Sequence, residues 1–185
     1  MSVLSYIELV QLVEDEVISP VSYDDINAAS IDIHLGNEIV VEMRPSQIVT
    51  HVRPIDIHKR EVFPSYKINI AEQGHYDLAP GEFILAHTRE IFNLPLDICA
   101  EFKLKSSGAR TGLENALATW ADNGWHGSTL TLELKNFLRW HPLRLTPGMK
   151  IGQMVFHRTV PVPVKRSYKH RGRYNNDKSV QTVKE

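Results

Sequence analysis

From residue 26 onward, short stretches of alternating apolar and polar residues are separated by Pro, Gly, Asn and Asp. Alternation over four to eight residues places successive side chains on opposite faces of a β-strand. Strands are predicted over residues 31–35, 38–43, 67–70, 83–87, 100–104, 129–134 and 150–157. The chain is therefore predicted to be mainly β.

One turn pattern occurs twice, each time directly before a predicted strand. Pro80-Gly81 precedes residues 82–85, and Pro147-Gly148 precedes residues 149–152. Pro presets φ at the second position of a type II turn, and Gly accepts the positive φ of the third position. Corners of this kind are typical of a compact β-barrel or a jelly roll.

The N-terminus has a different pattern, which predicts one short helix. Ser5 and Glu8 have the spacing of a capping box, and the apolar residues that follow recur at intervals of three and four. Pro20 ends this segment.

The C-terminal residues 164–185 are predicted to be a basic tail beyond a single domain formed by residues 1–163. Asp177 is the only acidic residue up to Val183, and few apolar residues occur there, so we expect the tail to have no core of its own and to order only on a partner. It could be a solvated terminus or a mobile cationic flap over an anionic ligand. Its basic residues are Lys165, Arg166, Lys169, Arg171, Arg173 and Lys178.

Charge and cysteine content exclude several classes of protein. Twenty-one Lys and Arg against 22 Asp and Glu give a net charge of −1, which argues against nucleic acid or an anionic membrane as partner. The single cysteine, Cys99, excludes an internal disulfide framework and a Cys-based zinc cluster. No apolar run approaches the roughly 20 residues of a membrane span, and no signal peptide is evident, so we expect a cytoplasmic location.

The densest group of polar residues is the segment Lys105-Ser106-Ser107-Gly108-Ala109-Arg110. Two cations flank two hydroxyls and a glycine, a combination that suits phosphate binding because hydroxyl and backbone groups donate while the cations neutralise. The same residues could form an ordinary polar loop in which the serines only satisfy a turn.

Two further segments could contribute to a site. In residues 129–135, alternation places Leu130, Leu132 and Leu134 on one face and centres Glu133 on the polar face. If that face lines a cleft, Glu133 could act as a general base and acid; if it faces solvent, it has no such role. In residues 118–127, two tryptophans flank a turn that contains Asp122, and they could form a platform for a ring or belong to the core.

Taken together, these segments resemble the dCTP deaminase family, which shares the trimeric dUTPase-like fold. The similarity covers nearly the whole chain through several motifs in the same order. They are NAASIDIHLG at 27–36, EFILAHTRE at 82–90, KSSGARTGL at 105–113, ATWADNGWHG at 118–127, TLELKN at 131–136 and PGMKIGQMVF at 147–156. The resemblance implies a distorted jelly roll or β-barrel with a short N-terminal helix, assembled as a homotrimer.

The resemblance also implies a reaction without zinc, in which dCTP is deaminated to dUTP and ammonia. It assigns proton transfer to Glu133, supported by Ser106 and by Arg110, which would hold the carboxylate ionised. The backbone at Ala118 would help hold the attacking water. Mg²⁺ would accompany the triphosphate. The nucleotide contacts implied are Lys105, Ser106, Ser107, Gly108, Ala109, Arg110, Asp122, Thr131, Leu132, Glu133, Tyr168, Arg173 and Asp177.

Three alternatives stay open. The chain could be a dUTPase or a bifunctional dCTP deaminase and dUTPase, it could deaminate a modified cytosine nucleotide, or it could be a non-catalytic nucleotide-binding regulator. Glu133 favours the deaminases, because hydrolytic dUTPases usually carry a non-acidic residue there. The family's tail pattern K-Y-x-x-Q ends here on Asp177, so an acid replaces a neutral amide and could alter specificity or repel the triphosphate.

Overall fold

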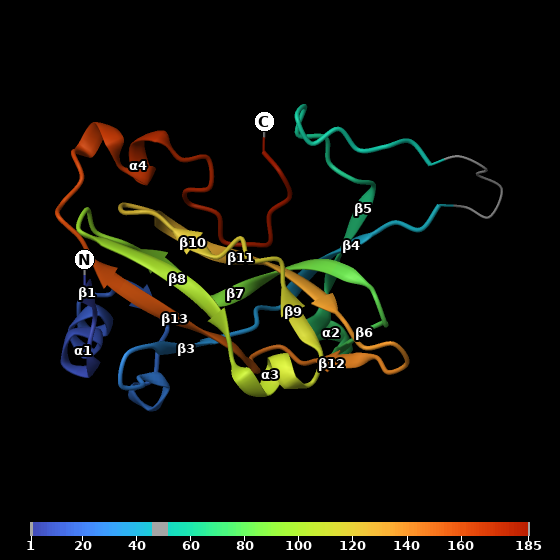
Figure 1. The fold of residues 1–185 in the computed structure, drawn as a ribbon, viewed down its shortest axis with the longest axis horizontal. Helices are drawn as coiled ribbons and strands as arrows, with labels where there is room; N and C mark the ends of the chain where they lie inside the picture. Colours follow the sequence, from blue (N-terminus) through green and yellow to red (C-terminus); the bar gives the residue numbers. More distant parts are fainter. Residues whose placement is uncertain (1, 46–51, 185) are drawn as a thin grey trace.

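The structure is a computed structural model that describes residues 2–45 and 52–184. Figure 1 shows two β-sheets with the helices at their margins. The helical segments are α1 (Tyr6–Glu14), α2 (Ile70–Gln73), α3 (Ser106–Arg110), α4 (Tyr168–Arg171) and the 3-10 turns η1 (Tyr23–Asp25) and η2 (Val164–Arg166). The strands are β1 (Ser2–Val3), β2 (Ile18–Ser19), β3 (Ile31–His34), β4 (Glu38–Glu42), β5 (Ser65–Asn69), β6 (Tyr76–Leu78), β7 (Phe83–Asn93), β8 (Ile98–Leu104), β9 (Leu113–Asn115), β10 (Trp120–Ala121), β11 (His126–Asn136), β12 (Leu143–Leu145) and β13 (Lys150–Arg158).

The strand order explains why segments far apart in sequence meet. One sheet has the order β1-β13-β8-β10, with β3 also paired to β13; the other has the order β5-β4-β7-β11-β9, with β2 also paired to β7. Strands β6 and β12 form a separate pair. All recorded pairings in the described chain are antiparallel, and its sheets do not close into a barrel. The prediction of a mainly β, jelly-roll-like fold is confirmed.

The local predictions agree with the structure at the turns and at the first helix. Both Pro-Gly corners contain a glycine with positive φ, +76° at Gly81 and +78° at Gly148. The backbone N–H of Glu82 donates to the carbonyl of Ala79, which closes the first turn. Ser5 and Glu8 form the predicted capping box. One strand ends earlier than predicted, because Ile70 begins α2 after the capping side chain of Asn69.

The two sheets share one apolar core, which includes the largest fully buried side chains Phe92, Phe102 and Phe156. Buried beside this core is an ion network between β3 and β7. The carboxylate of Glu90 is fully buried, accepts from the His34 backbone N–H at 3.0 Å and contacts His34 Nδ1 at 2.8 Å. Arg89 lies 3.2 Å from the same carboxylate.

Removal of Glu90 is expected to be costly, because it leaves His34 and Arg89 without their shared partner. We expect Glu90→Ala to lower the free energy of unfolding by about 3 kcal/mol, measured by urea denaturation. The exposed residue Glu14 on α1 provides a control, for which Glu14→Ala should change stability by less than about 0.5 kcal/mol. Equal effects of the two substitutions would contradict this prediction.

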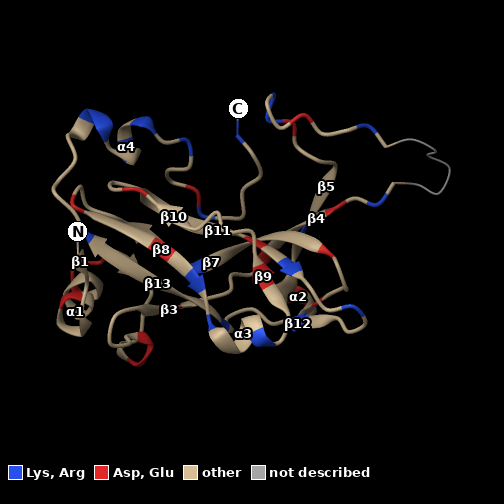
Figure 2. Ribbon diagram, viewed as in Figure 1, with Lys and Arg blue, Asp and Glu red and all other residues tan. Residues whose placement is uncertain are grey.

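Lys and Arg residues occur in several parts of the ribbon in Figure 2, including the connection between β4 and β5, and two groups of them bear on the site. One group lies in the tail around α4, and the other lies around α3 and the adjoining end of β8. In the view of Figure 1 the tail lies above the sheets and α3 lies below them. No helix in the described part of the chain is long and apolar enough to cross a membrane.

Candidate active site

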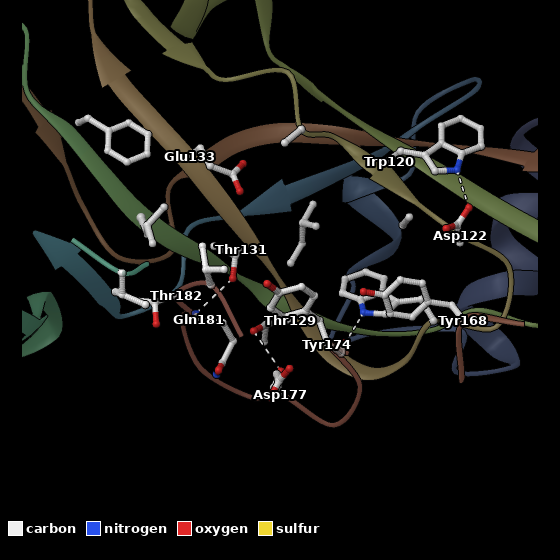
Figure 3. Close-up of a pocket in the computed structure, with 18 of the residues that line it drawn as sticks. Trp120, Asp122, Thr129, Thr131, Glu133, Tyr168, Tyr174, Asp177, Gln181 and Thr182 are labelled. Atoms are coloured by element: carbon white, nitrogen blue, oxygen red, sulfur yellow. Dashed lines mark hydrogen bonds between the residues drawn. The ribbon is translucent and has the colours of Figure 1, made fainter. Parts of the chain in front are cut away.

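A pocket of about 410 Å³ lies between β11 and the tail. Apolar and aromatic side chains form most of its wall, with a few polar groups among them (Figure 3). It is lined by Val62, Phe63, Phe83, Leu85, Ala118, Trp120, Ala121, Asp122, Trp125, Thr129, Leu130, Thr131, Glu133, Tyr168, Tyr174, Asp177, Gln181, Thr182 and Val183. A largely apolar cavity with few polar groups suits a small organic ligand.

Glu133 projects into this pocket from the middle of β11. It pairs across the sheet with Leu85 of β7, so both side chains lie on the same face. Burial raises the pKa of Glu133, although the residue's own backbone N–H lowers it in part. A carboxyl group whose pKa is raised toward neutrality can both accept and donate protons, as acid–base catalysis requires.

The pairing of β11 with β7 is irregular beside this carboxylate. Its register shifts between Thr129 and Thr131, and the backbone N–H of Leu130 donates instead to the Thr88 hydroxyl at 2.9 Å. Leu130 packs against the core that contains Leu132 and Leu134, as alternation predicts, and at this irregularity it also lines the pocket.

Asp122 and Trp120 lie at the other end of the pocket from Glu133 (Figure 3). The indole N–H of Trp120 donates to the Asp122 carboxylate at 2.9 Å, and its ring stacks on His157 at 5.9 Å between centroids. Half of the Trp120 surface is exposed, whereas Trp125 is buried in the core. Trp125 thus belongs to the core while also lining the pocket, and the role of Trp120 as a platform for a ring stays a prediction.

The tail forms the remaining wall of the pocket. The backbone N–H of Thr129 donates to the Asp177 carbonyl at 2.8 Å, and the Gln181 backbone N–H donates to the Thr131 hydroxyl at 3.3 Å. Val180 is buried against Val40 and Leu85. The tail therefore packs on the rest of the chain through Val180 and Tyr168, which its composition did not indicate. The proposed boundary at residue 164 and closure over a nucleotide stay predictions, and residue 185 lies outside the described residues.

The segment from Lys105 to Arg110, whose composition suits phosphate binding, lies apart from this pocket. None of the residues from Lys105 to Arg110 lines it, and Ser106, Ser107 and Arg110 are exposed on or beside α3. Lys105 Nζ lies 2.5 Å from Asp32 Oδ1. Burial raises the pKa of Asp32, but hydrogen bonds from Lys105 and Lys150 outweigh burial and hold the pKa below its usual value.

The expected contact between Arg110 and Glu133 is therefore absent within one copy of the chain. In Figure 1, α3 lies below the sheets and the tail that lines the pocket lies above them, and burial raises the pKa of Glu133 with no cation of the described residues among the causes. Arg173, a further predicted contact, lines a neighbouring polar cavity together with Arg166 and Arg171. Leu132 is buried behind the pocket.

Sequence reasoning missed the apolar wall that packs against Val180 of the tail. Phe63 and Phe83 pack edge to face with centroids 6.4 Å apart, and Leu85 lies beside them. Pairing of β7 with β11 would have indicated Leu85, but no local pattern places Phe63 there. Among the described residues, no group of three or more His, Cys, Asp or Glu side chains is placed to hold a metal ion.

Comparison with known proteins connects this site to a family. The profile of the dCTP deaminase-like family matches residues 3–159. The chain is 34% identical to "dCTP deaminase, dUMP-forming" of Nanoarchaeum equitans, over 89% of this chain and 87% of that protein. It is 33% identical to the protein of the same name in Persephonella marina, over 91% of this chain and 88% of that protein.

A solved structure has a similar fold. The 2'-deoxycytidine 5'-triphosphate deaminase of Agrobacterium tumefaciens aligns with a TM-score of 0.60 and 20% identity over 83% of this chain. The chain spans about half of that longer protein, 47% of its length. The match of the family profile to most of the chain, together with these relatives, shows that the protein belongs to the dCTP deaminase-like family.

Proposed function

We propose that this protein deaminates the cytosine ring of dCTP, with Glu133 transferring the protons. The observation that supports this most directly is the position of Glu133: its carboxyl group lines a mostly apolar pocket in which burial raises its pKa. The name of the relatives, dCTP deaminase, agrees with a cytosine nucleotide as substrate.

The chemistry needs a group that first accepts a proton and later donates it. Water adds to C4 of the ring while the Glu133 carboxylate takes a proton from the water and passes it to ring N3. A second proton transfer makes the amino group at C4 leave as ammonia, and the C4 oxygen becomes the carbonyl of uracil. One carboxylate within hydrogen-bond distance of the attacking water, of ring N3 and of the C4 amino group can serve each step.

The product of the complete reaction is proposed to be dUMP. The resemblance alone implied dUTP, but relatives named "dUMP-forming" favour the bifunctional alternative. In that case a second water attacks the α-phosphorus of dUTP, and the bond to the β-phosphate breaks to release diphosphate. The overall reaction consumes one dCTP and two waters and yields dUMP, ammonia and diphosphate.

We further propose that the site is shared between copies in a homotrimer. The pocket contains Glu133 and Asp122, but the exposed Lys105–Arg110 segment of the same chain lies away from it. A neighbouring copy can bring that segment to the pocket, where Ser106, Ser107 and Arg110 would bind the triphosphate with its Mg²⁺. Tyr168, Arg173 and Asp177 of the tail would close over the bound nucleotide.

A product screen tests this proposal. The purified protein is incubated with dCTP, dUTP, dCMP and 5-methyl-dCTP in the presence of Mg²⁺, and the products are separated by chromatography. We expect dUMP, ammonia and diphosphate from dCTP. Accumulation of dUTP without diphosphate would reduce the activity to deamination alone. Nucleotide-dependent thermal stabilisation without any product would instead identify a nucleotide-binding regulator.

A further inference from the structure

The last described residue of the tail, Lys184, folds back onto residues seven to eleven positions earlier. Its ammonium Nζ lies 2.6 Å from each carboxylate oxygen of Asp177 and donates to the Arg173 carbonyl at 3.3 Å. Its backbone N–H donates to the Tyr174 hydroxyl at 3.2 Å, and Nζ lies 5.4 Å from the Tyr174 ring centre. Lys184 therefore closes the tail into a loop.

This closed loop is the wall of the pocket described above. Tyr174, Asp177 and Gln181 all line the pocket, and the loop is attached to β11 through the backbone at Thr129 and the hydroxyl of Thr131. The contacts of Lys184 that hold the two ends of the loop together therefore also set the position of these lining residues.

The contact between Lys184 and Asp177 also has an electrostatic role, because the Asp177 carboxylate is charged. The Asp177 side chain is only 14% exposed, and it lines a pocket that already contains Glu133 and Asp122. A nucleoside triphosphate carries several negative charges, so an unpaired carboxylate at position 177 would repel it. Lys184 contacts both oxygens of this carboxylate and so forms an electrically neutral pair.

We propose that Lys184 is a positioning residue that neutralises Asp177 and thereby allows an anionic nucleotide to bind under the tail. The proposal rests on the function proposed above. It also explains how this chain tolerates an acid at a position where the resembling family has a neutral amide: the compensating cation lies seven residues further along the same loop.

Substitutions at the two positions separate charge compensation from simple attachment of the loop. We expect Lys184→Met to raise KM for dCTP about tenfold with kcat changed by less than about twofold, because it leaves a mostly buried carboxylate unpaired. Asp177→Asn should raise KM for dCTP less than Lys184→Met does. The double variant should bind dCTP better than Lys184→Met alone, and Lys184→Arg should retain most of the affinity. Added salt should reduce the defect of Lys184→Met, because it screens the repulsion.

Lys178 provides the matched control, since it is an exposed lysine on the same loop. Any effect of Lys178→Met should not be relieved by Asp177→Asn. The proposal is overturned if Asp177→Asn is as harmful as Lys184→Met, if the double variant is no better than Lys184→Met, or if kcat falls while KM stays constant. Dissociation constants for dCTP measured by calorimetry keep this test independent of turnover, so an inactive wild-type protein would contradict the proposed function alone.

Discussion

Glu133→Gln is expected to reduce turnover of dCTP by about a thousandfold or more, while the protein stays folded and still binds the nucleotide. The amide has nearly the shape of the carboxylate but cannot accept the proton of the attacking water. Ammonia release and chromatography of the nucleotides measure the loss, and calorimetry with dCTP measures binding. Glu114→Gln on the neighbouring strand β9 is the control, because Glu114 does not line the pocket.

The direction in which Glu133→Gln changes the stability of the protein can be predicted. Because burial raises the pKa of Glu133, the ionised carboxylate is disfavoured in the folded protein relative to the unfolded chain. At pH values above the unfolded pKa, ionised Glu133 therefore costs free energy of folding, and glutamine does not carry this cost. We expect Glu133→Gln to unfold at the same temperature as the wild type or higher near pH 7. A large decrease would show that Glu133 has a structural role instead.

The same raised pKa predicts the acid side of the activity profile. As the pH falls, the Glu133 carboxylate is protonated and can no longer take a proton from water. Because its pKa lies above the usual glutamate value, kcat/KM should decline at a higher pH than the titration of an exposed glutamate would give. The profile of kcat/KM between pH 4 and 8 measures this decline, and a midpoint at the ordinary glutamate pKa would contradict it.

The fold was largely predictable because its signals are local. Gly81 and Gly148 adopt the positive φ that their Pro-Gly context predicts, and the seven predicted strands lie within or overlap observed ones. Alternation also centred Glu133 on the polar face of its strand, but it left open whether that face lines a pocket or faces solvent. These features depend on backbone preferences and side-chain period, which a few neighbouring residues specify.

The remaining features of the site depend on contacts between distant segments. Leu130 lines the pocket where β7 and β11 change register, and Phe63 reaches the pocket from a long connection between β4 and β5. Motif order placed Arg110 and Glu133 in the same site, but it does not state whether both come from one chain. The structure separates them, so the arrangement of copies becomes the central question about the site.

Mixing two inactive variants is expected to restore activity if neighbouring copies share each site. Arg110→Ala removes the exposed guanidinium of α3, and Glu133→Gln removes the carboxylate of the pocket. Each variant alone should lose nearly all turnover. Co-expressed in equal amounts, they assemble at random, and about a quarter of the sites then receive an intact Glu133 from one copy and an intact Arg110 from the next.

A site contained in one chain would give a different result, because it would stay inactive in every mixture of the two variants. The double variant Glu133→Gln/Arg110→Ala mixed with Glu133→Gln is the matched control, since no site can then contain an intact carboxylate. Light scattering confirms that each preparation has the same oligomeric state. Recovery near a quarter of the wild-type rate in the first mixture and none in the control would support a composite site. Full activity of Arg110→Ala alone, or no recovery in the first mixture, would contradict it, because the carboxylate would then act without a guanidinium from a second copy.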